Sequence, residues 1–343
     1  MAARLSFKER SRFGAQFLRR NWRNLLTNQR GVITVEQHWV PRFHDNIMLT
    51  YQQKGSELQA WLMPDMVHND VRGAIDHHDR LGAVIASDVV DPFGQQNVLN
   101  PPSSRRAATL QSSDATVLVS DENTLRSMAD PQSPYTNTIV AAIGRRIDKH
   151  IIDACTAAAE VASVTVGSGV ITYSTQALPS SRIIGGATAI DLARIVNAGV
   201  LLTKAGVPAG SDRRGFLYAP GQEQNIMDIT QASSSDFTKN QIHDRGTLSG
   251  LVWQGFSWKC IPDVMQIDVT VLQRMLNLTS TTRHCIAFDR HSIGLSVGRP
   301  QGAPSIHERP DLRSIPIQVR QAIMMRAVRV FEGGVVRVDC LEN

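Results

Sequence analysis

The chain has 343 residues, of which 42% are hydrophobic and 20% charged, as in a globular protein with room for about two domains. No run of about 18 apolar residues is present and no apolar signal core follows the basic start, so we expect neither a membrane span nor a secretory signal. The four cysteines are widely separated in sequence, so they form no metal-binding motif and indicate no disulfide framework. This cysteine usage fits a reducing cytosol.

The net charge of +5 is concentrated at the start of the chain, where residues 1–30 hold eight basic residues against Glu9 alone. Phe13, Phe17 and Trp22 recur there at roughly helical spacing among arginines. We therefore expect a basic amphipathic arm over residues 1–36. It could bind a neighbouring subunit, contact nucleic acid or a scaffold through charge, resemble an organelle presequence by coincidence, or be a solvated tail. Its candidate contact residues are Arg12, Arg19, Arg20 and Arg23.

Next come a strand-like run over Leu58–Met66 and then a long polar excursion over residues 67–113. Asp91-Pro92 and Asn100-Pro101-Pro102 interrupt the excursion, and its apolar residues are too few for a core of its own. A segment of this kind needs a partner surface or is disordered, so we expect an extended loop. Its candidate contact residues are Arg72, Arg80, Arg105 and Arg106.

Asp76-His77-His78-Asp79, inside that excursion, has metal-ligating residue types in a row. Neighbouring residues point to opposite sides of a strand, and no distant ligand set presents itself. The pattern therefore favours a solvated loop without a metal ion.

A long helix is predicted over residues 134–159. Ser133 or Asp130 can cap it, and prolines fit a helix start because the missing N–H has no partner there. Its apolar stripe recurs every four residues, and neither a proline nor a pair of glycines interrupts the pattern before Gly167. The stripe consists of Ile139, Ile143, Ile147 and Ile151, continued by Ala154, Cys155 and Ala158.

The remainder alternates strands with short helices, which predicts an α+β fold. A second amphipathic helix is expected over Ala189–Ala205 and ends before Gly206. Other expected elements are a strand–turn–strand over Val161–Ile171, a buried strand at Gly215–Ala219, a helix over Pro220–Met227, and strands at Leu251–Ile261, His284–Phe288, Ile293–Val297, Ile315–Val328 and Val335–Cys340.

Signatures of catalysis are missing from the sequence, which contains no Gly-x-Ser-x-Gly, His-Glu-x-x-His or phosphate-loop motif. His284, His291 and His307 could each act as a general base, but isolated histidines are more often surface or hydrogen-bonded groups. We therefore expect neither an enzyme nor a cofactor.

A succession of short motifs runs through the chain in a fixed order. The motifs are Gln53-Lys54-Gly55-Ser56-Glu57-Leu58, Arg80-Leu81-Gly82, Ser104-Arg105-Arg106, Asp130-Pro131 with Ser133 and Tyr135, and Gly144-Arg145-Arg146-Ile147-Asp148 with Ile151-Ile152. In this order and spacing they resemble the major capsid proteins of tailed bacteriophages with the Hong Kong 97-type (HK97-like) fold. The resemblance runs from Gln37 to the last residues and leaves residues 1–36 without a counterpart.

The resemblance implies a division of the chain. A peripheral domain comprises residues 37–66, 114–185 and 315–343 and contains the predicted helix as its spine. The extended loop, 67–113, lies over a neighbouring subunit. Residues 186–314 form an axial domain around the five- and six-fold axes, and the final strands return to the peripheral sheet.

The implied function is self-assembly into an icosahedral head that encloses double-stranded DNA. Pentamers and hexamers of the chain, a portal, a scaffold and an optional decoration protein are then its partners, with assembly in the host cytoplasm and a final location in the virion. The alternatives are an encapsulin-like protein-cargo compartment of the same fold and a soluble enzyme with an unrecognised site.

Some relatives join their subunits by an isopeptide bond that starts from a loop lysine. No lysine lies between Lys54 and Lys149. Arginine cannot replace lysine as a nucleophile, because the guanidinium stays protonated. We therefore expect a shell held by noncovalent contacts.

Overall fold

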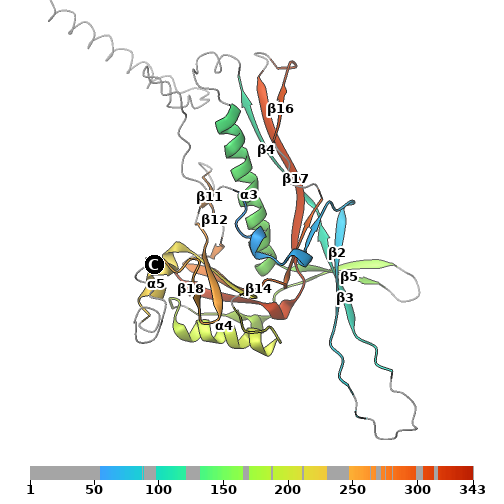
Figure 1. Ribbon diagram of the computed structural model, residues 1–343, viewed down its shortest axis with the longest axis vertical. Coiled ribbons are helices and arrows are strands. Elements are labelled where there is room, and N and C mark those ends of the chain that lie inside the picture. Colours follow the sequence, from blue (N-terminus) through green and yellow to red (C-terminus); the bar gives the residue numbers. More distant parts are fainter. Residues whose placement is uncertain are drawn as a thin grey trace, which may run out of the picture.

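The computed structural model shows an elongated subunit with a long upper body, a lower body and two projecting hairpins (Figure 1). It describes residues 55–86, 88, 98–120, 132–164, 170–186, 188–210, 212–229, 247–262, 264–267, 272–274, 276–279, 281–298, 304–312 and 316–342. The basic arm and its four candidate arginines lie outside these residues. Within the described part, no helix combines the length and apolar character needed to cross a membrane.

The upper body is a five-stranded sheet covered by one long helix. Strand β17 (Ile317–Arg329) is its centre and pairs with β4 on one side and with β15 and β16 on the other. Every second residue of β17 from Val319 to Ala327 is buried, as expected for a strand with one face on a core. The other strands are β1 (Val67–Asn69), β4 (Gln111–Val119), β15 (Ile293–Val297) and β16 (Ser305–Glu308).

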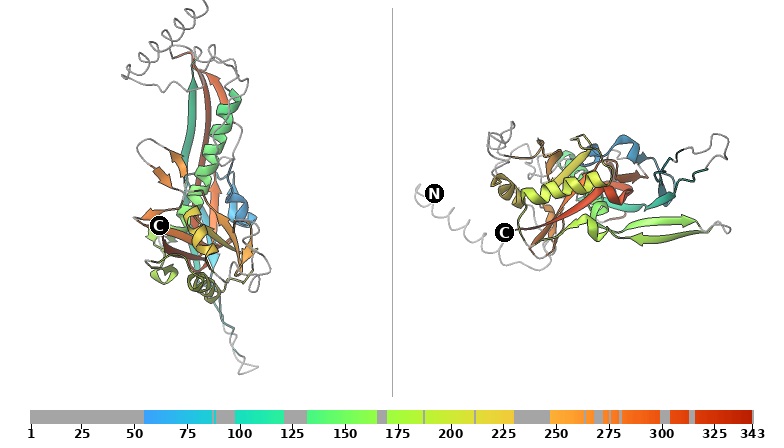
Figure 2. Two further views of the ribbon diagram at one scale, coloured as in Figure 1. Left: turned by 90° about the vertical axis from the view of Figure 1, so that its left-hand side faces the viewer. Right: turned by 90° about the horizontal axis from the view of Figure 1, so that it is seen from below.

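Helix α3 (Gln132–Thr156) runs beside β4 and β17, as two perpendicular views show (Figures 1 and 2). The predicted apolar stripe is confirmed, since Ile139, Ile143, Ile147 and Ile151 are all buried. The helix ends three residues before the predicted Ala159, which instead opens strand β5 (Ala159–Val164).

Arg329 marks the C-terminal end of α3. Its guanidinium donates to the carbonyl oxygens of Cys155 at 3.2 Å and Ala157 at 2.8 Å, and to that of Gln176 at 3.0 Å. The last carbonyls of a helix have no partner within the helix, so a cation placed there both satisfies them and complements the helix dipole.

The carboxylate of Asp148 holds the first described turn of the chain against α3. Ser56 Oγ donates to it at 2.5 Å, and the backbone N–H groups of Glu57 and Leu58 donate at 3.0 Å each. Gly55, with φ +75°, packs directly on Gly144, where an added Cβ would lie 2.2 Å from the Gly55 carbonyl carbon. The two glycines therefore permit the close approach that the carboxylate fixes.

The lower body is a seven-stranded sheet flanked by α4 (Leu192–Lys204) and α5 (Pro220–Met227). Asp191 caps α4 by accepting from the N–H of Arg194, and Gly206, with φ +83°, follows its end as predicted. The sheet contains β7 (Ile183–Ile184), β8 (Arg214–Tyr218), β9 (Val252–Trp253), β10 (Phe256–Cys260), β13 (Leu278–Thr279), β14 (Thr282–Asp289) and β18 (Val335–Leu341).

Two strands differ from the division expected from the resemblance. Strand β18 does not return to the upper sheet but pairs with β14 and β7, because its Val336, Val338 and Cys340 belong to the apolar cluster around Trp258. Strand β15, expected in the axial part, pairs with β17 and β1 of the upper sheet. The two bodies therefore exchange strands, and the domain limits stay a prediction.

The two hairpins form a third, four-stranded sheet in the order β2-β3-β5-β6. The strands are β2 (Ile75–Leu81), β3 (Ser103–Thr109), β5 and β6 (Ile171–Gln176). The projecting part of the first hairpin comprises fewer residues than the predicted loop 67–113, because β1 and β4 pair within the upper sheet.

Short elements complete the described chain. Two 3-10 helices, Gln59–Trp61 and Pro64–Met66, replace the strand expected at Leu58–Met66, since Asp148 binds the N–H groups that a strand would use for pairing. Others are the 3-10 helices Ser180–Arg182 and Glu332–Gly334 and the strand pair β11 (Val264–Ile267) and β12 (Leu272–Arg274).

His150 is a titratable group enclosed between α3 and β17. Its side chain is 6% exposed, and its Nε2 has no hydrogen-bond partner among the residues that the structure describes. Burial lowers the pKa of His150 to about 4, and the charges of Arg146, Lys149 and Arg326 act in the same direction while Asp153 opposes them. The folded subunit therefore holds His150 in its neutral form.

We expect Asp148→Asn to lower the free energy of unfolding by about 1–3 kcal/mol, because one backbone or hydroxyl donor then faces an NH₂ group and stays unsatisfied. Chemical denaturation of the unassembled subunit measures this loss. Asp153→Asn is the matched control on the same helix, since Asp153 is half exposed and forms a surface ion pair with Lys149. Equal stability losses for the two variants would contradict the role given to Asp148.

The pKa of His150 predicts a loss of stability in acid. A histidine with a depressed folded pKa contributes its full stability above the unfolded value of about 6.5 and loses it as the pH falls toward 4, since the unfolded chain then binds the extra proton. His150→Gln should remove roughly 2 kcal/mol of this loss at pH 5. The test is thermal unfolding at pH 7.5 and pH 5 of this variant and of a control, His307→Gln on the exposed strand β16. An equal loss of stability between the two pH values in both variants would refute the prediction.

Candidate assembly surfaces

The β2–β3 hairpin is attached to the body by a buried ion-pair network. Arg80 donates to Glu332 at 2.8 Å and to the carbonyl oxygen of Val330 at 3.1 Å, and the 1% exposed Arg106 bonds to the same glutamate. Burial alone would raise the pKa of Glu332, but the hydrogen bond from Arg80 and the charges of both arginines outweigh it, so this pKa lies below its usual value. The glutamate is therefore a fixed negative charge between two cations.

The predicted loop arginines thus fall into two groups. Arg80 and Arg106 face inward and hold the root of the hairpin. Arg105 points outward and forms a two-bond pair with Asp79 at 2.5 and 2.8 Å, while Arg72 is exposed in the turn before β2. Of these four arginines, Arg72 and Arg105 have the most exposed side chains in the isolated subunit.

Beyond its paired strands, the first hairpin carries exposed apolar side chains. Ile85 and Val98 are each 87% exposed, and Leu81 and Val84 are also exposed. Residues 82–86 and 98–102 extend away from the body in Figure 1. A monomer rarely leaves such residues together in water, so this arm has the character of a contact surface.

The β5–β6 hairpin is a second arm, which the sequence analysis identified only as a strand–turn–strand. All six residues of β6 are exposed, and Ile171 and Tyr173 lie on one face with Val170 just before them. Figure 2 shows this hairpin projecting from the body. In the sequence this arm is indicated only by a strand-like alternation, without a second apolar segment that could pack on it.

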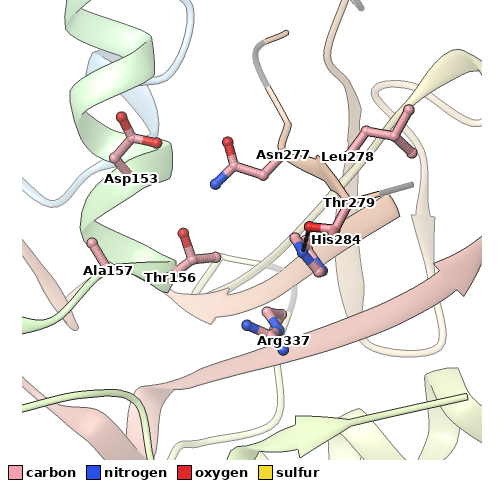
Figure 3. A pocket seen from close by; sticks show the side chains of 8 residues that line it. All are labelled: Asp153, Thr156, Ala157, Asn277, Leu278, Thr279, His284 and Arg337. Atoms are coloured by element: carbon pink, nitrogen blue, oxygen red, sulfur yellow. Dashed lines mark hydrogen bonds between the residues drawn. The ribbon is translucent and has the colours of Figure 1, made fainter. Parts of the chain in front are cut away.

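A cavity of about 580 Å³ lies between the end of α3 and the lower sheet (Figure 3). His284 is at its centre, with Nδ1 2.5 Å from Asp339 and Nε2 3.1 Å from the Thr279 hydroxyl. Burial would raise the pKa of Asp339, but the hydrogen bonds from His284 and Arg337 lower it below its usual value.

These polar groups brace α3 against the lower sheet. Lys149 of α3 donates to Asn277 at 2.9 Å, and Arg337 bonds to the same carboxylate as His284. The hydroxyl–imidazole–carboxylate order is that of a nucleophile with its base, but Thr279 sits on a two-residue strand and Asp339 is also bound by Arg337 of its own strand. The arrangement favours a structural role for the histidine.

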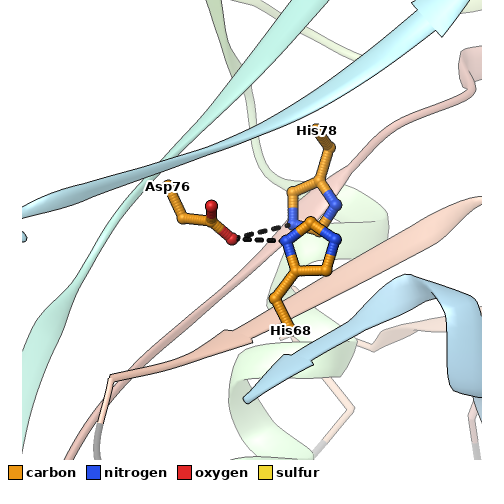
Figure 4. Close-up of side chains that lie close together, drawn as sticks. All are labelled: His68, Asp76 and His78. Atoms are coloured by element: carbon orange, nitrogen blue, oxygen red, sulfur yellow. Dashed lines mark hydrogen bonds and ion pairs between the residues drawn. The ribbon is translucent and has the colours of Figure 1, made fainter. Parts of the chain in front are cut away.

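The sequence expectation for Asp76-His77-His78-Asp79 as a solvated loop is wrong. These residues lie in β2, and His78 is only 4% exposed because its ring packs on the backbone of Gly294 in β15. Alternation along the strand places Asp76 and His78 on the same face, where His68 of β1 joins them (Figure 4). Sequence reasoning missed His68, because eight residues and a turn separate it from Asp76.

Comparison with solved structures identifies the fold. A chain of Mycobacterium phage Che8 superposes with a TM-score of 0.60 at 14% identity, covering 88% of this chain and 97% of that one. A chain from the capsid of Ralstonia phage GP4 gives 0.60 at 12% identity, covering 92% and 98%. One from the capsid of Cyanophage Pam1 gives 0.58 at 12%, covering 91% and 98%. The predicted α+β, Hong Kong 97-type fold is confirmed.

The sequence matches no curated protein. A family model described as phage capsid protein, however, matches residues 35–342. This range agrees with the resemblance, which runs from Gln37 to the last residues. Such a match, together with the fold and the two arms, shows a shell-forming subunit with a structural role that is located in the virion capsid. The chain belongs to the phage capsid protein family.

Proposed function

We propose that this subunit is the major head protein of a tailed bacteriophage, which closes as pentamers and hexamers into an icosahedral shell around double-stranded DNA. The observation that carries the proposal is the pair of hairpin arms, which leave a well-packed body and expose apolar side chains on both. Neighbouring copies of the subunit bury this surface when they assemble symmetrically.

The loop arginines then have two tasks. Arg80 and Arg106 hold the first arm at its root through Glu332, so that its direction is fixed before a neighbour is met. Arg72 and Arg105 are available for contacts with an adjoining subunit or with phosphate groups. A guanidinium suits both because it binds carboxylate and phosphate with two hydrogen bonds.

The basic residues 1–30 supply the contact with the packaged genome or a scaffold. Arg12, Arg19, Arg20 and Arg23 are the proposed contacts, and they act through charge and not through base recognition. A portal, a scaffold and an optional decoration protein are the remaining proposed partners, with assembly in the host cytoplasm. No catalytic activity is part of the proposal.

An encapsulin-like compartment would use the same fold to enclose protein, and the cargo separates the two functions. Particles purified from producing cells should hold double-stranded DNA that resists added nuclease, and electron microscopy should show closed icosahedral shells. Shells that are filled with a single host protein would favour the compartment, and soluble monomers under all conditions would contradict both.

The second arm should be needed for assembly and not for folding. We expect Ile171→Asp combined with Tyr173→Asp to change the free energy of unfolding by no more than about 0.5 kcal/mol, since both side chains are exposed, yet to stop the subunit at free capsomers. Thr172→Asp with Ser174→Asp, on the opposite face of the same strand, is the control and should assemble. Electron microscopy distinguishes the two, and normal shells from the first variant would show that no neighbour covers this face.

The mature shell should contain no covalent link between subunits, because the segment 55–148 has no lysine to attack a neighbouring side-chain amide. Boiled, reduced shells should run on a denaturing gel as a single band near 37.7 kDa. A ladder of linked pentamers and hexamers would refute the expectation.

A further inference from the structure

Three side chains with metal-binding atoms meet at the root of the first arm. His68 comes from β1, and Asp76 and His78 come from one face of β2 (Figure 4). Their ligand atoms all lie within 4.8 Å of one another. Nδ1 of His68 is 2.7 Å and Nε2 of His78 is 3.7 Å from the same oxygen of Asp76.

Ser296 of β15 completes the cluster. Its hydroxyl donates to Asp76 at 2.6 Å and lies 2.9 Å from Nε2 of His78. The register of the parallel β1–β15 pair places Ser296 opposite His68, so three strands fix the four groups. The backbone therefore sets their positions, and only side-chain torsions have to adjust when an ion enters.

We propose that His68, Asp76 and His78 bind one zinc-class divalent ion, with water or the Ser296 hydroxyl in the fourth position. Two imidazole nitrogens and a carboxylate oxygen are ligands that Zn²⁺ takes in proteins, at about 2.0–2.2 Å. In a tetrahedral site such ligands stand about 3.3 Å apart. The distances of 2.7 and 3.7 Å to Asp76 lie on either side of that value, and all three ligand atoms lie within 4.8 Å of one another, so rotations of the side chains can bring them to ligating distance.

The surroundings of the cluster also fit an ion. Gly294 makes room for the His78 ring, since a Cβ there would lie 2.6 Å from it, and this packing fixes the direction of the ring. His68 and His78 are stacked with their ring centres 4.2 Å apart and an interplanar angle of 12°. Because a ring nitrogen binds a metal in the plane of its ring, the more exposed His68 ring has to turn when an ion enters. His68 is 38% exposed and Asp76 18%, so an ion can enter from solvent.

A bound ion would have a mechanical effect. β1 and β15 belong to the upper sheet, whereas β2 is the first strand of the projecting arm. One ion bridging β1 and β2 would join arm and body beside the Glu332 network and stiffen the arm at its root. The proposal thus goes beyond shell formation and stands whether or not the shell encloses DNA.

The test is titration of the full-length, unassembled subunit with Zn²⁺ by calorimetry and with Co²⁺ by visible absorption. We expect one ion per chain, an intense tetrahedral Co²⁺ band, and a higher melting temperature with Zn²⁺. His68→Gln and Asp76→Asn should each weaken binding at least about tenfold, because even outer-shell partners of metal sites contribute 10–100-fold.

His77→Gln is the matched control, since the neighbouring residue of the same strand points to the other face, and it should bind like the wild type. If Asp76→Asn does not fold, His68→Gln alone tests the proposal, because His68 is half exposed and its replacement should leave the fold intact. Circular dichroism checks that fold. Absence of one-to-one binding in the wild type would overturn the proposal. Undiminished binding by His68→Gln would also do so, because the ion would then lie elsewhere.

Discussion

The buried carboxylate of Asp148 is the contact on which the packing of the upper body depends. It lies in the middle of α3 and accepts three hydrogen bonds from residues 56–58, far away in sequence. Once these bonds form, Leu58 lies among the stripe residues of α3 and the following 3-10 helices are held over the sheet. A carboxylate is suited to this because it is acceptor-only and can take several donors at once.

Gly55 and Gly144 make that contact possible by contributing no side chains to it. Helix and turn approach so closely that any Cβ on Gly144 would overlap the Gly55 backbone. A glycine inside a helix costs roughly 0.5–1 kcal/mol relative to alanine. The hydrogen bonds to Asp148 offset this cost. Two of the short motifs that resemble phage capsid proteins are therefore the two sides of one interaction.

Buried arginines connect the layers of the subunit in a related way. Arg329 bonds to three carbonyl oxygens around the end of α3 and the end of β6, and Arg106 reaches Glu332 from the arm. Burial lowers the pKa of both guanidinium groups, yet arginine stays charged because its reference pKa is so high. Removing Glu332 would leave the buried charge of Arg106 uncompensated, which is far more costly than losing a surface ion pair.

Local patterns predicted much of this fold. The stripe of α3, the end of α4 at Gly206, helix α5 and strand β15 all follow from periodicity and from helix-stopping residues. Which sheet a strand joins could not be predicted, because β17 and β18 both have apolar strand patterns and the strands that they pair with lie far away in the sequence. The candidate sites show the same limit. His68 and Ser296 lie opposite each other in the β1–β15 pair and meet Asp76 from a different sheet, and the inward direction of Arg106 depends on Glu332, more than 200 residues away.

The exchange of strands between the two bodies also bears on the order in which the chain can fold. β17 is the centre of the upper sheet and β18 lies inside the lower one, and both follow every other described strand in the sequence. Neither core can close until residues 317–341 have left the ribosome. Contacts of such long range form slowly. A growing chain therefore has no finished surface to offer its neighbours, so that shell assembly is confined to subunits in which both sheets are already complete.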